Sequence, residues 1–453
     1  MLPPKNILVI GGNAAGPAAA AKVKRTAPNS NVVMFEAGDF ISTGTCELPY
    51  VLSGEIRNYK DIIFFSAESF EKEKGVKVLT NHQVEKIDRS NKKITVRNLL
   101  SNQSFDQNYD KLVLATGSKA KSLPGINDLA KNVFTFKTVK DYLAIKKYLG
   151  TTSVRKVLII GAGYIGLEAA EAFKSLNYDV TILEKENLPM PAVDDEARNL
   201  ILDLIKKNGI EFYGGLKNLK YGYREEKIST ITLDGYTREF DVIILATGFE
   251  PNNSLAVASK LNLGKYGGLK VDQKLRTSDP NIFAAGDNIE VINKITGQPD
   301  YIPLATYAQQ MGHIAGENAA GGNAISSPVI KNIAVKIFDK YLVAVGLNSI
   351  EARKSKINFI SVHAVTSNLV KVMPGCENVF GKLIIEKSSR KITGAVFLGG
   401  KEVSGYGDII STFIQNQIKA NELSRVNFNY SPPISPFINL LSILGRKAEK
   451  ELL

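Results

Sequence analysis

The stretch Val157-Leu-Ile-Ile-Gly-Ala-Gly-Tyr-Ile-Gly166 decides the fold. Its apolar opening is typical of a strand that is buried on both faces, as in a parallel sheet. The glycines predict a tight turn into a helix whose free N–H groups can meet a pyrophosphate. A second strand, Val180-Thr-Ile-Leu-Glu184, ends in an acid placed to bind a ribose diol. The segment therefore predicts a dinucleotide-binding unit.

An earlier stretch repeats this pattern. Residues Ile7–Glu36 show strand, glycine turn, alanine-rich helix, strand and acid, with the turn Gly11-Gly-Asn-Ala-Ala-Gly16. Asn13 replaces the middle glycine of the fingerprint. A phrase ending in Ala-Thr-Gly follows each copy, at Tyr109–Gly117 and at Phe240–Gly248. The sequence thus predicts two dinucleotide-binding units, each built on a parallel sheet.

Length and composition limit the remaining choices. The chain has 453 residues, which suggests about three domains, and a net charge of +12 from 57 Lys+Arg and 45 Asp+Glu. Such a basic balance allows polyanionic partners. The two cysteines, Cys46 and Cys376, exclude a disulfide scaffold and a multi-cysteine zinc site, and three histidines make a histidine-rich metal centre improbable. We therefore predict no metal site.

Neither a leader peptide nor a membrane span is predicted. The N-terminus leads directly into an apolar strand, Asn6–Ile10, and no apolar run approaches about 18 residues. We expect a cytoplasmic protein with reduced thiols.

The sequence pattern changes after about residue 325. Short alternating segments at Lys331–Phe338 and Gly381–Glu386 predict an antiparallel sheet with one solvated face. A helix is predicted over Tyr406–Asn421, and a proline-rich corner follows at Ser431–Pro436.

Two nucleotide sites in this order suggest electron transfer between a flavin and a nicotinamide. Asp287, at the end of the segment Ile282–Asp287, is placed to hold flavin ribityl hydroxyls, and a helix cap or turn residue is the alternative. The carboxylate of Glu184 would repel a 2′-phosphate, so NADH is favoured, with NADPH as the alternative because Lys185 stands beside it.

The sequence resembles the pyridine nucleotide–disulfide oxidoreductase family over nearly the whole chain. The markers are both fingerprints, both Ala-Thr-Gly phrases, Gly286-Asp287 and Pro303–Glu317. The resemblance implies an α/β fold with two Rossmann-like domains and a C-terminal α+β dimerisation domain, as in glutathione reductase, and a homodimer. It places the FAD-binding domain at 1–118 and 250–325, the NAD(P)H-binding domain at 119–249 and the interface domain at 326–453.

The resemblance also implies the cofactor contacts. Those to FAD are Gly11, Asn13, Gly16, Glu36, Ser42, Thr116, Gly117, Gly286, Asp287, Pro303 and Ala305. Those to NADH or NADPH are Gly161, Gly163, Tyr164, Gly166, Glu184 and Gly248. Tyr164 resembles a tyrosine that shields the flavin until the nicotinamide displaces it, and plain core packing is its alternative.

The candidate redox cysteine is Cys46, in Ser42-Thr-Gly-Thr-Cys-Glu-Leu-Pro-Tyr50. It has no partner four or five residues away, which disfavours the paired-cysteine branch and fits the single-cysteine Cys-x-x-Pro-Tyr branch. A helix predicted from Pro49 would stabilise its thiolate. Glu47 would raise the thiol pKa if it faced the sulfur. A buried, inert cysteine is the alternative.

That branch holds coenzyme A-disulfide reductases, persulfide and polysulfide reductases, NADH oxidases and NADH peroxidases. The last two carry a histidine where Ala14 stands, which argues against oxygen or peroxide chemistry. Tyr430 matches an interface tyrosine that protonates the leaving thiolate, with a packed aromatic as its alternative. A second tyrosine is missing, because Lys371-Val372 stand in its place.

Basic residues on the first helix complete the site. Lys22 and Arg25 share a helix face that would meet the nucleotide end of coenzyme A, a candidate bound ligand, and a solvated basic face is the alternative. Cys376 is interpreted as structural, with a resolving thiol as the alternative. His313 is interpreted as a packing or solvent contact rather than a catalytic residue.

We therefore predict an FAD-dependent NAD(P)H oxidoreductase. It would reduce coenzyme A disulfide, coenzyme A persulfide or polysulfide through Cys46. The alternative is an NADH oxidase or peroxidase that cycles through a sulfenic acid at Cys46. A nucleic-acid-binding flavoprotein is a distant alternative, because the basic residues are spread along the chain rather than clustered.

Overall fold

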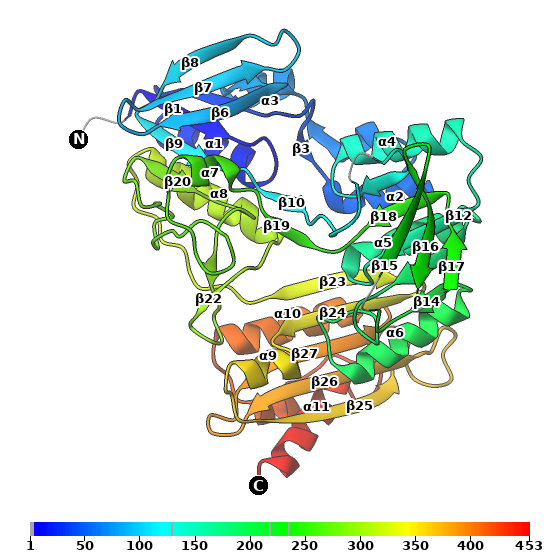
Figure 1. Ribbon diagram of the computed structural model, residues 1–453. Coiled ribbons are helices and arrows are strands. Elements are labelled where there is room, and N and C mark those ends of the chain that lie inside the picture. The colour runs from blue at the N-terminus through cyan, green and yellow to red at the C-terminus, as the bar shows by residue number, and fades with distance from the viewer. Residues whose placement is uncertain (1–3, 128–129, 217–218, 234–235) are drawn as a thin grey trace.

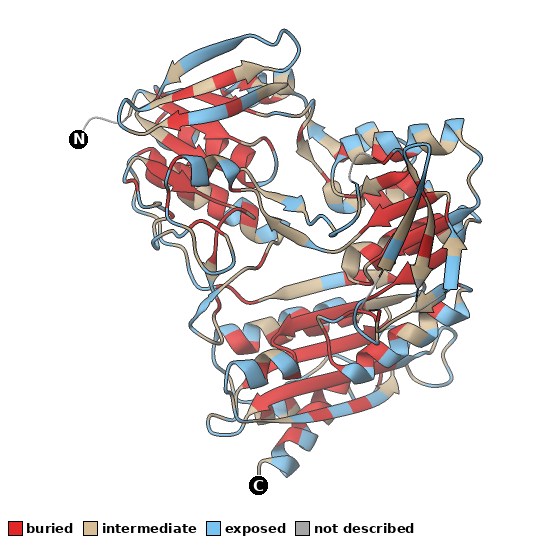
Figure 2. Ribbon diagram, in the orientation of Figure 1, coloured by how far each residue is buried: buried red, intermediate tan, exposed pale blue. Residues whose placement is uncertain are grey.

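The computed structural model describes residues 4–127, 130–216, 219–233 and 236–453, and three five-stranded sheets organise it (Figure 1). The central strands of these sheets are buried, and several edge strands are partly exposed (Figure 2). This agrees with the continuous apolar runs in the sequence, because strands covered on both faces lose their contact with water. The predicted α/β class with two Rossmann-like sheets is confirmed.

The first sheet is parallel in the order β5-β2-β1-β9-β20. Its strands are β1 Asn6–Ile10, β2 Asn31–Phe35, β5 Lys77–Leu79, β9 Lys111–Leu114 and β20 Ile282–Ala284. The helices α1 (Ala15–Thr26) and α8 (Ala305–Ala319) pack closely together. A Cβ on Gly312 would lie 2.3 Å from the carbonyl oxygen of Ala15, so only glycine allows this approach.

Smaller elements complete this unit. A three-stranded antiparallel sheet consists of β6 His82–Asp88, β7 Lys93–Asn98 and β8 Ser104–Asn108. Short elements beside it are β4 Ile63–Phe65, α3 Ala67–Lys74 and α7 Ser254–Ala258.

The second sheet repeats the design in the order β11-β18-β12-β13-β14. Its strands are β11 Val133–Thr135, β12 Lys156–Ile160, β13 Asp179–Leu183, β14 Glu211–Tyr213 and β18 Val242–Leu245. Its helices are α4 Val139–Thr151, α5 Tyr164–Ser175 and α6 Asp195–Lys207, and an antiparallel sheet adds β15 Leu219–Arg224, β16 Lys227–Leu233 and β17 Tyr236–Glu239.

Two antiparallel strands connect the two units. The strands β10 (Ser118–Ala120) and β19 (Phe249–Pro251) pair with each other and run between the first and second sheets (Figure 1). The chain crosses from one unit to the other and back at this pair. The domain boundaries after residues 118, 249 and 325 stay a prediction.

The third sheet is antiparallel in the order β23-β24-β27-β26-β25. Its strands are β23 Asn332–Ile337, β24 Lys340–Gly346, β25 Phe359–Ser367, β26 Asn378–Glu386 and β27 Ile392–Gly399. Both segments predicted as strands are strands. The helices are α9 Ser349–Lys354, α10 Val403–Gln415 and α11 Leu440–Glu451.

The C-terminal helices differ from the prediction. The helix expected over Tyr406–Asn421 begins at Val403 and ends at Gln415, and residues Ala420–Arg425 form a separate 3-10 turn. The helix α11 was not predicted. Within the described ranges no helix has both the length and the apolar character needed to cross a bilayer.

A buried ion cluster fastens the second unit to the third sheet. Lys382 of β26 lies 2.9 Å from Asp194 and 2.8 Å from Glu196, at the start of α6. Only 6% of the Lys382 and Asp194 side chains is exposed. Asp194 also accepts hydrogen bonds from the backbone N–H and the hydroxyl of Ser349, both at 2.8 Å.

Candidate functional site

Cys46 lies in a short turn between two elements. It belongs to the 3-10 turn Thr45–Glu47, which follows β3 (Ile41–Thr43) and precedes α2 (Leu48–Ser53). Pro49 stands in the first turn of α2, as predicted. The cysteine is a free thiol open to solvent.

The electrostatic surroundings of Cys46 raise its pKa. Desolvation by burial is the largest cause. The carboxylates of Glu47 and Glu168 raise it further, and Lys137 lowers it. The pKa of the thiol is thus raised overall, and the stabilisation of the thiolate by the helix stays a prediction. The expected effect of Glu47 is confirmed.

Lys137 is a site residue that sequence reasoning missed. Its Nζ donates a hydrogen bond to Ser118 Oγ at 2.8 Å, and Ser118 donates to Asp287 at 2.9 Å. The ammonium lies 3.9 Å from the centre of the Phe249 ring. Burial lowers its pKa. Its position just after β11 was a usable signal, because ligands of parallel sheets bind at the carboxyl ends of the strands.

The first glycine loop is filled by backbone and side chains. A Cβ on Gly11 would lie 2.1 Å from the Ala115 carbonyl oxygen. Asn13 donates to the Thr43 hydroxyl at 2.8 Å and accepts from the Thr43 backbone N–H at 2.7 Å, which ties this loop to the strand before Cys46. Glu36 accepts from the backbone N–H of Gly12 at 2.7 Å.

The second glycine loop has the same backbone but more space. Gly161 has φ +106°, and a Cβ on Gly166 would lie 1.9 Å from its carbonyl oxygen. A Cβ on Gly163 would meet nothing within 4 Å. Glu184 accepts from the backbone N–H of Ala162 at 2.7 Å.

The other predicted cofactor residues lie where the parallel strands end. Thr116 and Gly117 follow β9, Gly286 and Asp287 follow β20, and Gly248 follows β18. Pro303 and Ala305 lie at the N-terminus of α8, and Ser42 is the middle residue of β3. The carboxylate of Asp287 lies close enough to Cys46 to raise the pKa of its thiol.

These surroundings fit two dinucleotides. The helices α1, α5 and α8 all begin without a side-chain cap, so their first N–H groups are available to phosphate or flavin oxygens. The hydroxyl of Tyr164 is buried and forms no hydrogen bond with any residue of the described ranges. The individual cofactor contacts stay a prediction.

The predicted substrate residues are spread over two regions. Lys22 pairs with Glu317 of α8 at 2.9 Å, and Arg25 lies 3.2 Å from the ring nitrogen of His313. Tyr430 is half exposed and stacks edge-on against Phe437, with ring centres 5.4 Å apart. Cys376, before β26, is a second free thiol. The roles predicted for these residues stay predictions.

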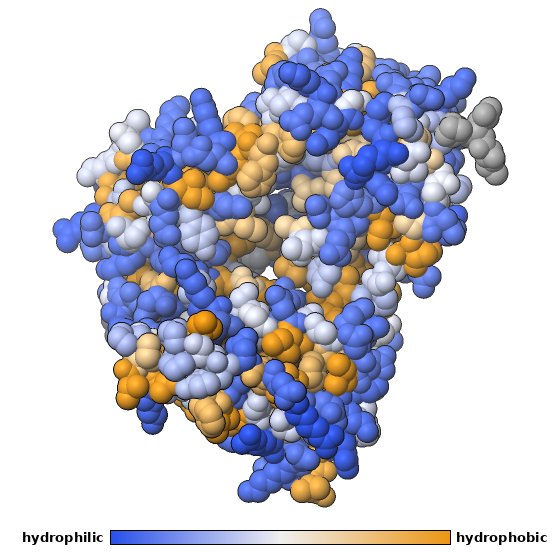
Figure 3. All heavy atoms as spheres, turned by 180° about the vertical axis from the view of Figure 1, so that it is seen from behind, coloured by the Kyte–Doolittle hydropathy of each residue, from blue (hydrophilic) through white to orange (hydrophobic). Residues whose placement is uncertain are grey.

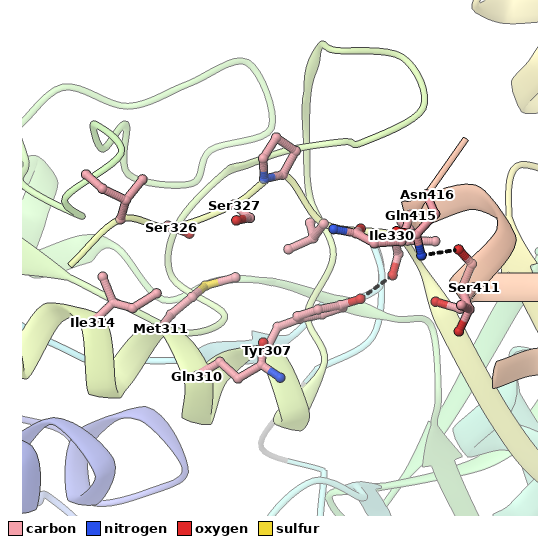
Figure 4. A pocket seen from close by; sticks show the side chains of 14 residues that line it. Tyr307, Gln310, Met311, Ile314, Ser326, Ser327, Ile330, Ser411, Gln415 and Asn416 are labelled. Atoms are coloured by element: carbon pink, nitrogen blue, oxygen red, sulfur yellow. Dashed lines mark hydrogen bonds between the residues drawn. The ribbon is translucent and has the colours of Figure 1, made fainter. Parts of the chain in front are cut away.

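A cavity of about 430 Å³ lies between α8 and α10 (Figure 4). Tyr307, Gln310 and Met311 line it from one side and Ser411 and Gln415 from the other. None of the described residues that line it is charged, and the hydroxyl of Tyr307 donates to the carbonyl oxygen of Ile330. Viewed from behind, the molecular surface is hollowed near its centre (Figure 3).

A family model described as pyridine nucleotide-disulphide oxidoreductase matches residues 5–312, and the dimerisation domain of the same family matches residues 333–440. The chain belongs to this family. It is therefore an FAD-dependent oxidoreductase that uses NAD(P)H. The recognition of the family from its motifs is confirmed.

Three relatives illustrate the range of named activities. A protein of Methanocaldococcus jannaschii named NADH oxidase is 32% identical over 98% of this chain and 99% of its own length. A coenzyme A disulfide reductase of Staphylococcus haemolyticus is 28% identical over 98% and 99%. The solved structure of an NAD-dependent persulfide reductase from A. fulgidus superposes with a TM-score of 0.94, 31% identity and coverage of 98% and 83%.

Proposed function

We propose that this enzyme uses NAD(P)H, with NADH preferred, to reduce a disulfide or persulfide of coenzyme A, or polysulfide, through Cys46. The supporting observation is the free, open thiol of Cys46 at the N-terminus of α2. The other cysteine, Cys376, lies in the loop before β26, so the redox loop itself offers a single thiol. A single thiol suits substrates that themselves supply the second sulfur.

The sulfur chemistry follows from that geometry. FAD, when bound, passes two electrons from NAD(P)H to sulfur. The Cys46 thiolate attacks one sulfur of the substrate, which breaks its S–S bond, forms a mixed disulfide and releases one thiolate. Two electrons then break the mixed disulfide and release the second thiolate. Each turnover converts one disulfide, one NAD(P)H and one proton to two thiols and NAD(P)⁺.

Residues at the rim would bind and protonate the substrate. Lys22 and Arg25 would meet the phosphates of coenzyme A, at the cost of their pairing with α8. Tyr430 of the partner subunit would protonate the leaving thiolate in a homodimer. The dimerisation domain and the exposed Phe437 and Ile434 support this assembly. We place the enzyme in the cytoplasm, where both of its thiols stay reduced.

The Cys46→Ser variant tests the proposed function. We expect disulfide-dependent NADH consumption to fall at least about 1,000-fold, because the hydroxyl cannot form the mixed disulfide. The Cys376→Ser variant is the matched control and should keep its rate. Full turnover by Cys46→Ser with coenzyme A disulfide and polysulfide would contradict the proposal.

An NADH oxidase or peroxidase is the second candidate, and the relative from M. jannaschii favours it. It would cycle through a sulfenic acid at Cys46. Ala14 offers no proton donor for that reaction. Rates of NADH consumption with oxygen, peroxide, coenzyme A disulfide and polysulfide compare the candidates directly, and dimedone labelling of Cys46 during turnover would favour the oxidase.

A further inference from the structure

A loop follows the acid that ends the second strand of the second unit. Residues 185–193 lead from Glu184 toward α6, and we name them the 185–193 loop. Its first three residues are exposed, whereas Pro189 and Met190 are buried. Because the exposed start follows Glu184 directly, the contacts of the buried part decide where this start lies.

Both carboxylate oxygens of Glu184 accept backbone hydrogen bonds. Oε2 accepts from the N–H of Ala162, in the second glycine loop, at 2.7 Å, and Oε1 accepts from the N–H of Glu186 at 3.0 Å. The carbonyl oxygen of Ala162 accepts from the N–H of Met190 at 2.8 Å. Glu184, the second glycine loop and the 185–193 loop are therefore bonded to one another, and a shift of the loop would disturb all three.

The buried side chain of Arg198 holds this loop from α6. Its Nε donates to the carbonyl oxygen of Pro189 at 2.9 Å, and its Nη2 donates to that of Leu188 at 2.7 Å. Its Nη1 donates to Asp195, three residues earlier in the helix, at 2.8 Å. Only 8% of the Arg198 side chain is exposed, against 71% of the Asp195 side chain. The buried donors of the guanidinium thus go to two successive carbonyl groups of the loop, which its planar fork suits.

The third sheet holds the start of the same helix. The helix α6 runs beside that sheet (Figure 1). Asp194, the residue before α6, pairs with Lys382 and accepts two hydrogen bonds from Ser349. Arg198 lies about one helical turn after Asp194. It therefore projects from the part of α6 that the third sheet fixes.

The first unit holds its acid through a shorter connection. Residues 37–40 lead from Glu36 to β3, and the N–H of Gly38 donates to Glu36 at 2.7 Å. A longer loop has more conformational freedom to lose, so it needs more contacts to be held in one position. The longer loop of the second unit gains such contacts from Arg198.

We propose that Arg198 is a positioning residue of the NADH site, and that it keeps the 185–193 loop where Glu184 binds the adenosine ribose of NADH. The proposal rests on the proposed preference for NADH and deepens it. Without Arg198 the loop loses two hydrogen bonds, and the N–H of Glu186 is no longer held against Glu184. The carboxylate then binds the ribose hydroxyls less well and repels a 2′-phosphate less strongly. Arg198 acts through the loop and takes no part in hydride transfer.

Binding of NAD⁺ and NADP⁺ to the oxidised, FAD-loaded enzyme tests this proposal without turnover, since neither can reduce the flavin. Calorimetric titration compares the parent with Arg198→Met, whose side chain keeps an apolar stem and donates no hydrogen bond. We expect the Kd for NAD⁺ to rise about five- to twentyfold and the Kd for NADP⁺ to change by about twofold or less. The KM for NADH should rise with the Kd for NAD⁺ while kcat stays the same, because only binding is weakened.

Amide hydrogen exchange of residues 185–193 provides a second measurement. In Arg198→Met this loop should exchange about tenfold faster, while β26 keeps the parent rate. Lys206→Met removes a positive charge from an exposed position of the same helix, so it is the matched control and should behave as the parent does. Arg198→Lys should fall between the parent and Arg198→Met, because an ammonium lacks the planar fork that donates to both carbonyl groups.

The proposal is overturned if Arg198→Met, folded as judged by its melting temperature, binds NAD⁺ and NADP⁺ with the parent constants. Should that variant not fold, Asp195→Ala replaces it, because it loosens Arg198 by removing an exposed partner. We expect it to raise the Kd for NAD⁺ about twofold, and an unchanged Kd overturns the proposal equally.

Failure of the proposed function gives a different result. A parent enzyme that binds NADP⁺ as tightly as NAD⁺ contradicts the preference for NADH, and the Kd of Arg198→Met for NAD⁺ still decides whether Arg198 positions the loop. The Cys46→Ser assay measures the sulfur chemistry separately, so neither binding result bears on it.

Discussion

The two nucleotide units share a backbone but differ at the third residue of the glycine loop. Asn13 in the first unit is hydrogen-bonded to Thr43, so its loop is fastened to the strand before Cys46. Gly163 in the second unit faces open space. The comparison teaches that the same turn can be fastened to a neighbouring strand by a side chain or left with open space beside it.

A second difference lies two residues after the last glycine of each loop. The first unit has the buried Ala18, and the second has Glu168. An apolar methyl group suits plain packing of helix on sheet. A carboxyl group at the equivalent place adds a titratable group on the helix that packs against α2.

The largest expected effect is the loss of stability when an ion pair of each unit is broken. Lys382→Ala should lower the unfolding free energy by about 3–5 kcal/mol, because Asp194 and Glu196 would stay buried or half-buried without their cation. Lys22→Ala, which breaks a half-exposed pair in the first unit, should cost at most about 1 kcal/mol. Calorimetric melting of both variants measures the difference, and equal losses would contradict it.

The next expected effect is a pH dependence of stability that Glu168 causes and that Ala18, at the equivalent place in the first unit, cannot cause. A carboxyl group whose pKa is raised from 4.5 to about 7 keeps its proton in the folded chain and loses it in the unfolded chain. Wild-type stability should therefore fall as pH rises from about 4.5 to about 7, by about 3 kcal/mol. Glu168→Gln should lack this loss. Melting temperatures of both proteins at pH 5 and pH 8 test this expectation. The same difference in melting temperature between the two proteins at both pH values would contradict it.

A smaller effect concerns the two acids that end the second strands. Glu184→Ala should reduce the NADH-over-NADPH ratio of kcat/KM about tenfold, because the carboxylate no longer repels a 2′-phosphate. Glu36→Ala is the matched change in the first unit. It should lower the bound flavin, read from absorbance, and leave that ratio unchanged. If Glu184→Ala left the NADH-over-NADPH ratio of kcat/KM unchanged, the result would contradict binding of the adenosine ribose by Glu184.

The smallest expected effect comes from exchanging the third residue of the glycine loop between the two units. Asn13→Gly removes the bonds to Thr43 and should cost about 1 kcal/mol of stability. Gly163→Asn should leave the melting temperature unchanged and raise the KM for NADH, because its side chain enters the open space. The opposite pattern, with the fold lost in Gly163→Asn, would show that the second loop is closed as well.

Local sequence patterns were sufficient to predict the two nucleotide units, but they were insufficient to predict which side chains surround the candidate site. The strands and turns of both units were predictable because glycines at positive φ and apolar runs act over a few residues. Lys137 was missed because it reaches Ser118 and Asp287 from a distant part of the chain. The raised pKa of Cys46 was missed because it depends mainly on burial. Glu168 was visible just after the second fingerprint, but Tyr50 of α2 and Lys336 of β23 lie far from it in the chain, so its surroundings could not be predicted.

The interrupted first unit has a consequence for synthesis on the ribosome. β20 pairs with β9, yet all of the second sheet lies between them in the chain. The second unit can therefore fold while the first still waits for its last strand. Until residue 284 has emerged, β9 presents an unpaired parallel edge, the kind of surface at which nascent chains stick to one another. Slow elongation between residues 245 and 282 would prolong that exposure, and this segment is where codon choice or a chaperone would matter most for the yield of folded enzyme.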